Sequence, residues 1–197
     1  MLALLPALVL FTVVASVTPG PNNIMLMTSG LNFGFRRTLP HLWGVDLGFT
    51  LMTLLVGLGL AGIFTAAPVL LTAMKWAGAA YLVVLAVKIA RSGPIGAGRS
   101  SGKPLTFLQA ASFQWVNPKA WMMAVTACAT YTDPTNYAFG VVVVAAVFGL
   151  VSIPAVAAWV GFGAALQRWL SHPRNLRIFN YTMAASLIAS LYPVFHD

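Results

Sequence analysis

The sequence predicts an all-α integral membrane protein of six transmembrane helices, arranged as a 3+3 inverted repeat with spans 1 and 4 broken at proline motifs. Three observations support this prediction: the composition, the number of apolar stretches, and the placement of prolines and basic residues. Of 197 residues, 59% are hydrophobic and only 7% are charged. A soluble domain of this length carries far more charge, so the sequence indicates a bilayer as its solvent.

Six apolar stretches are long enough to cross a bilayer, which takes about 20 residues per helix. We expect the spans at about 2–28, 38–63, 68–91, 105–131, 137–167 and 175–195. The first stretch lacks the basic start of a signal peptide, so we expect it to be retained as a span. Residues typical of turns separate the spans: 32–37, 66–68, the Gly/Ser/Pro-rich segment 92–104, 132–136 and 171–175.

Basic residues predict the orientation of these spans. Nine of the eleven Lys and Arg residues lie in or beside the first, third and fifth connectors, namely Arg36, Arg37, Lys88, Arg91, Arg99, Lys103, Arg168, Arg174 and Arg177. Cytoplasmic connectors carry such an excess, so this side is expected to be cytoplasmic and both termini to lie outside. The net charge of +8 then indicates topology and contact with membrane lipid, not a nucleic-acid partner.

The chain is expected to form a single transmembrane domain, residues 1–197, built from repeat A (about 1–100) and repeat B (about 101–197). Each repeat holds three spans, and because three is odd the two repeats must have opposite orientations. Pro21 and Pro118 fall at comparable depth in the first span of each repeat, both near an asparagine. This arrangement predicts an inverted-topology repeat.

A proline motif interrupts the first span of each repeat. The motif is Thr18-Pro19-Gly20-Pro21-Asn22-Asn23 in repeat A and Gln114-Trp115-Val116-Asn117-Pro118-Lys119 in repeat B. Proline has no amide hydrogen and clashes with the preceding turn, so backbone groups are freed where lipid offers no water. Paired interruptions of this kind are typical of a transporter's binding site. The candidate substrate-binding residues are Pro19, Gly20, Pro21, Asn22, Asn23, Gln114, Asn117, Pro118 and Lys119.

Each polar residue of these motifs has a structural alternative. The asparagine amides offer donors and acceptors that suit the carboxylate and ammonium of an amino acid, or they cap the broken helices. The ammonium of Lys119 either occupies carbonyls freed by Pro118 or binds a carboxylate substrate.

Asp46 is the only carboxylate expected inside the membrane, because the chain has no Glu, Asp133 is in a connector and Asp197 is the last residue. We expect Asp46 to alternate between a proton and a cationic partner, with Lys75 or Lys119 within reach. The alternatives are a fixed ion pair or a protonated Asp46 bonded to backbone, and for Lys75 a side chain that extends to the interface.

Other features are expected to be structural. His41 is expected to be an interfacial histidine at the cytoplasmic mouth of span 2. Gly30-x-x-x-Gly34 and Gly44-x-x-x-Gly48 are expected to be surfaces of close helix approach, and such faces permit a homodimer. A lone cysteine and scattered histidines argue against a metal site, and we expect no cofactor.

The motifs together resemble those of the LysE/RhtB amino-acid exporters. The resemblance covers essentially the whole chain and rests on Thr-Pro-Gly-Pro-Asn at 18–22, Asn-Pro-Lys at 117–119, and Trp-Ala-Gly-Ala-Ala-Tyr-Leu at 76–82 followed by Lys88. Gly-Phe-Arg-Arg at 34–37 and Phe-Gln-Trp-Val-Asn at 113–117 resemble the cysteine/O-acetylserine branch. The resemblance implies export across a bacterial inner membrane, driven by proton exchange, with the two motifs forming the central site.

We therefore expect a secondary transporter that exports small amino acids or derivatives similar to cysteine, O-acetylserine or homoserine by proton antiport. The alternatives are a non-transporting membrane subunit or scaffold, or a cation exporter. The absence of Glu and of a Cys/His cluster disfavours cation export. An enzyme is not expected, because no nucleophile–base pair stands in the spans.

Overall fold

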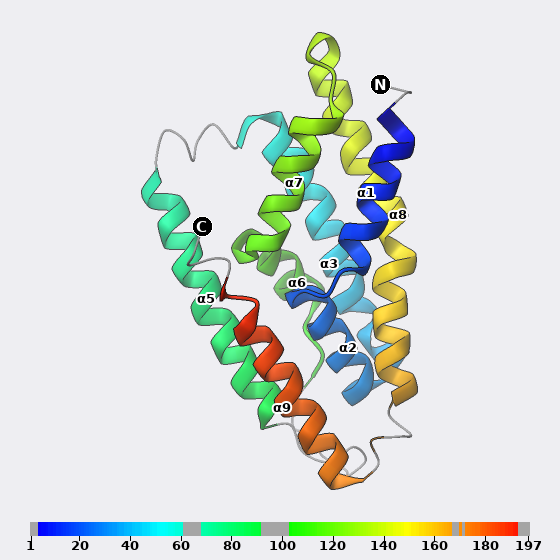
Figure 1. The fold of residues 1–197 in the computed structure, drawn as a ribbon, viewed down its shortest axis with the longest axis vertical. Coiled ribbons are helices and arrows are strands. Elements are labelled where there is room, and N and C mark those ends of the chain that lie inside the picture. The colour runs from blue at the N-terminus through cyan, green and yellow to red at the C-terminus, as the bar shows by residue number, and fades with distance from the viewer. Residues whose placement is uncertain (1–3, 61–67, 92–102, 167–169, 171, 193–197) are drawn as a thin grey trace.

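A computed structural model describes residues 4–60, 68–91, 103–166, 170 and 172–192, and all regular structure in these ranges is helical. Figure 1 shows the arrangement of the helices. Their bounds are α1 Leu5–Val17, α2 Pro21–Phe33, α3 Phe35–Leu55, the π-helical η2 Val56–Leu60, α5 Pro68–Ala90, α6 Phe107–Phe113, the 3-10 turn η3 Gln114–Val116, α7 Pro118–Tyr131, the 3-10 turn η4 Pro134–Asn136, α8 Tyr137–Leu166 and α9 Pro173–Ala189.

Helices α3 and α8 pack against each other in the centre of the molecule. The short helices that flank the breaks pack on them: α1 and α2 lie on α8, while α6 lies on α3. Helices α5 and α9 form a separate pair, which Figure 1 shows along the side of the molecule away from α8. The segments of the broken helices are therefore positioned by α3 and α8.

Helices end at both predicted proline motifs. Helices α1 and α2 meet at an angle of 55°, with Gly20 in a fully extended conformation between them. The second break lies at Asn117, whose φ of −90° and ψ of 108° separate η3 from α7. In both places a proline begins the following helix, where its missing amide hydrogen has no helical acceptor to lose.

Glycines allow the closest approaches between these helices. A Cβ on Gly163 of α8 would lie 1.9 Å from the carbonyl oxygen of Met27 on α2, and one on Gly30 would lie 2.2 Å from that of Val160. Gly44 and Gly48 face α6 in the same way, as predicted from their spacing. Gly34 differs from the prediction: nothing lies within 4 Å of its Cβ position, and its φ of 79° makes the turn between α2 and α3.

The first connector is shorter than expected. The sequence predicts a turn at 32–37, but α2 continues to Phe33 and α3 starts at Phe35, so Gly34 alone joins them. A glycine at positive φ lets the chain reverse in one residue.

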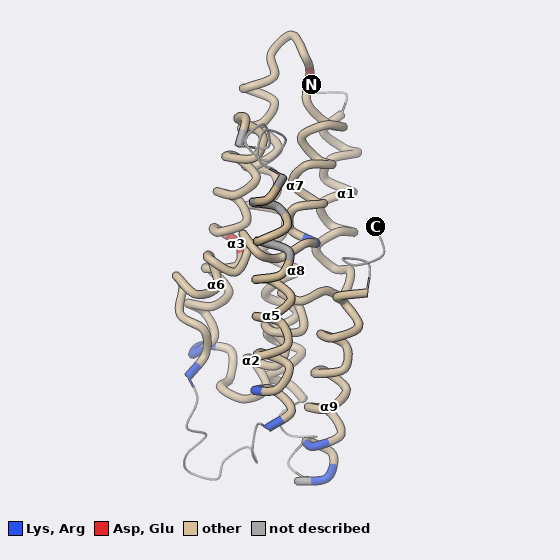
Figure 2. The backbone as a smooth tube through the Cα atoms, turned by 90° about the vertical axis from the view of Figure 1, so that its left-hand side faces the viewer, with Lys and Arg blue, Asp and Glu red and all other residues tan. Residues whose placement is uncertain are grey.

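Two helices in the described ranges are long and apolar enough to cross a membrane, Phe35–Gly59 and Pro134–Leu166. The bent pair Leu5–Val17 and Pro21–Phe33 meets the same test when counted as one span, and Trp76–Ala90 is a shorter apolar helix. Figure 2 shows most of the basic positions gathered at one end of the molecule, where α2 and α5 end and α9 begins, and one near the middle. The six-span arrangement itself stays a prediction.

Candidate functional site

The two breaks lie against each other, and the residue after each helix-starting proline reaches across to the opposite motif. The ammonium of Lys119 donates to the carbonyl oxygen of Thr18 at 2.6 Å, with that of Pro19 at 3.5 Å. Asn22 and Gln114 exchange two side-chain amide hydrogen bonds, of 2.8 and 3.2 Å. Four polar side-chain contacts thus join segments about a hundred residues apart.

The other two asparagines cap their own breaks. Asn23 donates from Nδ2 to the carbonyl oxygens of Ser16 and Thr18, at 2.8 and 2.9 Å. Asn117 accepts the backbone N–H of Lys119 through Oδ1 at 3.2 Å, which caps α7. The capping interpretation therefore holds for Asn23 and Asn117, whereas Asn22 pairs with Gln114. Gly20 offers α2 no side-chain cap.

Lys119 binds a different set of carbonyls from the one expected. The sequence suggests carbonyls freed by Pro118, but the ammonium lies at the C-terminal end of α1, in the first motif. This end of a helix carries a partial negative charge, so a cation there is favourable. Gly20 makes room for it, since a Cβ at that position would lie 2.7 Å from Cδ of Lys119.

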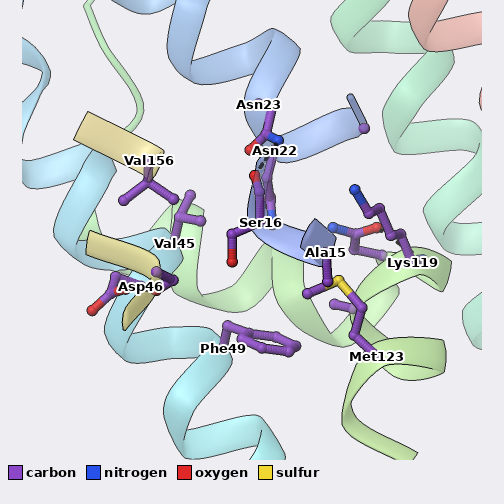
Figure 3. Close-up of a pocket in the computed structure, with 14 residues that line it drawn as sticks. Ala15, Ser16, Asn22, Asn23, Val45, Asp46, Phe49, Lys119, Met123 and Val156 are labelled. Atoms are coloured by element: carbon purple, nitrogen blue, oxygen red, sulfur yellow. Dashed lines mark hydrogen bonds between the residues drawn. The ribbon is translucent and has the colours of Figure 1, made fainter. Parts of the chain in front are cut away.

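A cavity of about 50 Å³ lies between the breaks and the α3–α8 pair, which is room for a few water molecules. Figure 3 shows the side chains around it. Its polar lining comes from both motifs and from α1, α3 and α8, and its apolar lining from α1, α3, α7 and α8. The lining residues are Ala15, Ser16, Gly20, Asn22, Asn23, Val45, Asp46, Phe49, Asn117, Lys119, Ala120, Met123, Ser152 and Val156.

The cavity brings together most of the residues predicted from the sequence. Gly20, Asn22, Asn23, Asn117, Lys119 and Asp46 line it. Gln114 lies one contact away, behind Asn22. Pro19, Pro21 and Pro118 shape the breaks without lining the cavity. The side chain of Lys75, on α5, lies outside the described part of the structure.

Asp46 is buried, at 3% exposure, and its partner is a serine instead of a lysine. The hydroxyl of Ser152 on α8 donates to Oδ1 of Asp46, while Oδ2 is buried without a hydrogen-bond partner among the described residues. Figure 3 shows Asp46 and Lys119 on opposite sides of the cavity, with Ser16 and Asn22 between them. Lys119, one of the two lysines expected within reach of Asp46, therefore does not pair with it in this structure.

Sequence reasoning missed Ser152 and the apolar walls. Ser152 is a polar residue in a long apolar run, two positions before Pro154, and this was the available signal. The apolar walls include Val45 and Phe49, one turn apart on α3, and nothing in their residue type marks them.

His41 is fully buried within the protein at 1% exposure, and neither ring nitrogen has a hydrogen-bond partner among the described residues. Within the same residues, no three His, Cys, Asp or Glu side chains are grouped so that they could hold a metal ion.

The sequence was compared with protein families, with individual proteins and with solved structures. Residues 13–190 match the family described as LysE type translocator. The chain is 35% identical, over 98% of its own length and 98% of the relative's, to the cysteine/O-acetylserine efflux protein of Escherichia coli O139:H28. It is 37% identical to the proteins of that name from Shigella sonnei and Shigella flexneri, over 89% of the chain and 90% of each relative. No solved structure matches the chain.

Proposed function

The chain belongs to the LysE type translocator family and is a multi-pass membrane protein, and from this premise we propose that it exports small amino acids by proton antiport. The substrates are cysteine, O-acetylserine or homoserine-like molecules, and the membrane is a bacterial inner membrane. The names of the relatives, cysteine/O-acetylserine efflux proteins, support this substrate class.

The observation that carries the proposal is the cavity at the crossing of the two broken helices. Its lining residues include Gly20, Asn22 and Asn23 at the start of α2. The first backbone bond of α2 runs from Ile24 N–H to Gly20, so the N–H groups before Ile24 fall outside the helical ladder. A helix N-terminus of this kind attracts anions.

Lys119 supplies the matching charge. Its ammonium lies beside Gly20, bound to a carbonyl that also accepts a hydrogen bond from Asn23. The substrate carboxylate binds between this ammonium and the start of α2, with the Asn22 amide as a further donor. Thr18 keeps its bond from Asn23 when Lys119 turns toward the carboxylate, so the exchange gives up only the long 3.5 Å contact of the ammonium with the Pro19 carbonyl.

The size and walls of the cavity favour a small substrate. Phe49, Met123 and Val156 supply apolar surface, and about 50 Å³ of free volume holds a few water molecules, so the cavity must widen for any amino acid and widens least for one with a short side chain. A short, neutral or sulfur-containing side chain fits this surface best, because it needs no charged partner of its own.

The packing pattern supports a single domain, 1–197, made of two inverted repeats. The first half of each broken helix packs on the long helix of the other repeat: α1 lies on α8, and α6 lies on α3. The α3–α8 and α5–α9 contacts pair equivalent elements. Rocking of the repeats about the breaks would give alternating access. The basic end faces the cytoplasm, and both termini face outward.

Counterflow in proteoliposomes tests the proposal. Vesicles loaded with unlabelled amino acid should accumulate radiolabelled O-acetylserine, cysteine or homoserine, while lysine should be taken up poorly. Asn22→Ala should reduce the rate severalfold. Asn32→Ala is the matched control on the same helix, because Asn32 donates to the Thr28 carbonyl and is not among the residues that line the cavity. Absence of flux for every amino acid tested would overturn the proposal and favour a non-transporting membrane protein.

A further inference from the structure

One carboxylate oxygen of Asp46 is buried and unpaired among the described residues, and the site proposed for the substrate's carboxylate does not account for it. Its Oδ1 accepts the hydroxyl of Ser152, while Oδ2 has no hydrogen-bond partner among the described residues. The residue is 3% exposed and lines the same cavity as Lys119, at the opposite wall. An ionised carboxylate in this position is costly unless a cation pairs with it, and a proton removes the cost by neutralising the group.

We propose that Asp46 is the ammonium subsite of the substrate cavity and that a proton competes with the substrate's ammonium for the same carboxylate. This inference rests on the proposed export function and deepens it. A zwitterionic amino acid would then span the cavity, with its carboxylate at the start of α2 and Lys119 and its ammonium at Asp46.

The charges around Asp46 favour a ligand over a fixed partner. Helices α1, α2, α6 and α8 and the turn η3 contain no Asp, Glu, Lys, Arg or His within their printed bounds. The groups that remain on α3, α7 and α8 are Arg36, Arg37 and His41, then Lys119, Cys128 and Tyr131, and finally Tyr137.

None of these groups is a cation that pairs with Asp46. The arginines are exposed at the start of α3, and Lys119 is bound to Thr18 across the cavity. His41 precedes Asp46 by five residues on α3 and has no hydrogen-bond partner among the described residues, so it does not neutralise the carboxylate. The thiol of Cys128 lies near the Thr53 carbonyl. Tyr131 is the last residue of α7, at the end away from Lys119, and Tyr137 is the first residue of α8.

Ser152 is the positioning residue of this subsite. It lies on α8, 106 residues from Asp46, and its hydroxyl donates to one carboxylate oxygen, while the other is buried without a hydrogen-bond partner among the described residues. The bond also joins α3 to α8, the long helices of the two proposed repeats. Binding of a ligand at Asp46 therefore acts directly on a contact between the two proposed repeats.

Competition at one carboxylate is sufficient for antiport. When the substrate's ammonium binds, the proton on Asp46 passes to water on that side of the membrane. When the substrate leaves on the other side, a proton from that side takes its place. Because Asp46 cannot hold both, net export of substrate is exchanged for inward movement of a proton when the protein with an unoccupied Asp46 does not change sides, and substrate can still exchange for substrate in counterflow.

Equilibrium binding of L-homoserine to the purified full-length protein in nanodiscs tests this directly. The apparent dissociation constant should rise by up to about tenfold per unit of falling pH once Asp46 is protonated, and binding should release protons into weak buffer. Asp46→Asn should weaken binding about tenfold or more, abolish proton release and flatten the pH dependence. Ser152→Ala should weaken binding less and keep the pH dependence.

Asp133→Asn is the matched control, since Asp133 lies in the linker between α7 and α8 and bonds to Thr135. It should behave as wild type. The deaminated analogue 4-hydroxybutyrate should bind wild type and Asp46→Asn equally weakly, because it has no ammonium.

Two results would overturn the inference. One is wild-type pH dependence with full discrimination against 4-hydroxybutyrate in a folded Asp46→Asn protein. The other is wild-type homoserine binding that releases no proton and does not weaken at low pH, which decides the matter even if Asp46→Asn fails to fold. The export function would survive either result, provided that wild-type protein shows amino-acid counterflow.

Discussion

Replacing Lys119 with methionine separates a structural lysine from a substrate-binding one. The change keeps most of the apolar stem and removes the ammonium that donates to Thr18 at 2.6 Å. A hydrogen bond from a charged group contributes about 1.5–3 kcal/mol. A cation in the middle of a membrane costs about 2.5–3.5 kcal/mol on insertion scales. The two effects oppose each other, so the free energy of unfolding should change by no more than about 2 kcal/mol.

The backbone left behind adds little to this cost. The carbonyl oxygen of Thr18 still accepts a bond from Asn23 at 2.9 Å, and Thr18 is exposed in the structure. Transport should respond far more strongly, because the substrate carboxylate loses its cation. Loss of one member of a buried charge pair costs about 2 kcal/mol or more, which corresponds to about 30-fold in apparent affinity.

The assay combines thermal unfolding in detergent with counterflow of radiolabelled O-acetylserine, using Lys103→Met as a control. Lys103 is exposed at the basic end of the molecule, so removing its charge should leave both readouts unchanged. Wild-type counterflow affinity in Lys119→Met would refute the carboxylate role. A loss of more than about 3 kcal/mol of stability would show instead that the lysine is a structural clamp.

Three further predictions concern the packing and the breaks. Gly163→Ala should destabilise the protein by about 1–3 kcal/mol or more in thermal unfolding, because its Cβ meets backbone at 1.9 Å; Gly161→Ala, with nothing nearer than 3.9 Å, should not. Asn117→Ala removes the cap of α7 and should cost about 0.5–2 kcal/mol in the same assay; no change in melting temperature would contradict the capping role. In a double-mutant cycle, Asn22→Ala and Gln114→Ala should show a coupling of about 0.5–1.5 kcal/mol, and additive effects would count against the amide pair.

The helix breaks could be predicted from the sequence because proline acts locally. The constraint of Pro21 and Pro118 on the preceding turn does not depend on what packs around it. The capping roles of Asn23 and Asn117 were also within reach, since short polar side chains bond to nearby backbone. Which asparagines cap the helices and which pairs across the breaks could be decided only from the tertiary structure.

The partners of Asp46 and Lys119 could not be predicted from the sequence. Depth along a straight helix places the two residues at a similar level, but it does not give the direction in which each side chain points. In lipid a helix can be apolar on every side, so the sequence of α8 does not show which face carries Ser152 inward. Because α1 and α2 are bent by 55°, counting residues along a straight helix does not give the position of a residue in this span.

The same argument applies to the apolar walls of the cavity. Met123 lines the cavity, whereas its neighbour Met122 is 62% exposed on the outer surface of the protein. Neither residue type nor local pattern distinguishes the two, because both environments are apolar. Only the packing of α7 against α1 and α3 does so.

Substrate protection of a cavity cysteine tests the central claim most directly, namely that the amino acid binds between the two broken helices. In a Cys128→Ala background, Met123→Cys should react with a small, membrane-permeant maleimide, and saturating O-acetylserine should slow that reaction severalfold. Asn136→Cys, in the exposed linker before α8, should react at the same rate with or without substrate. An unchanged rate at Met123→Cys, in vesicles of the same variant that carry out O-acetylserine counterflow, would place the substrate elsewhere and contradict this account.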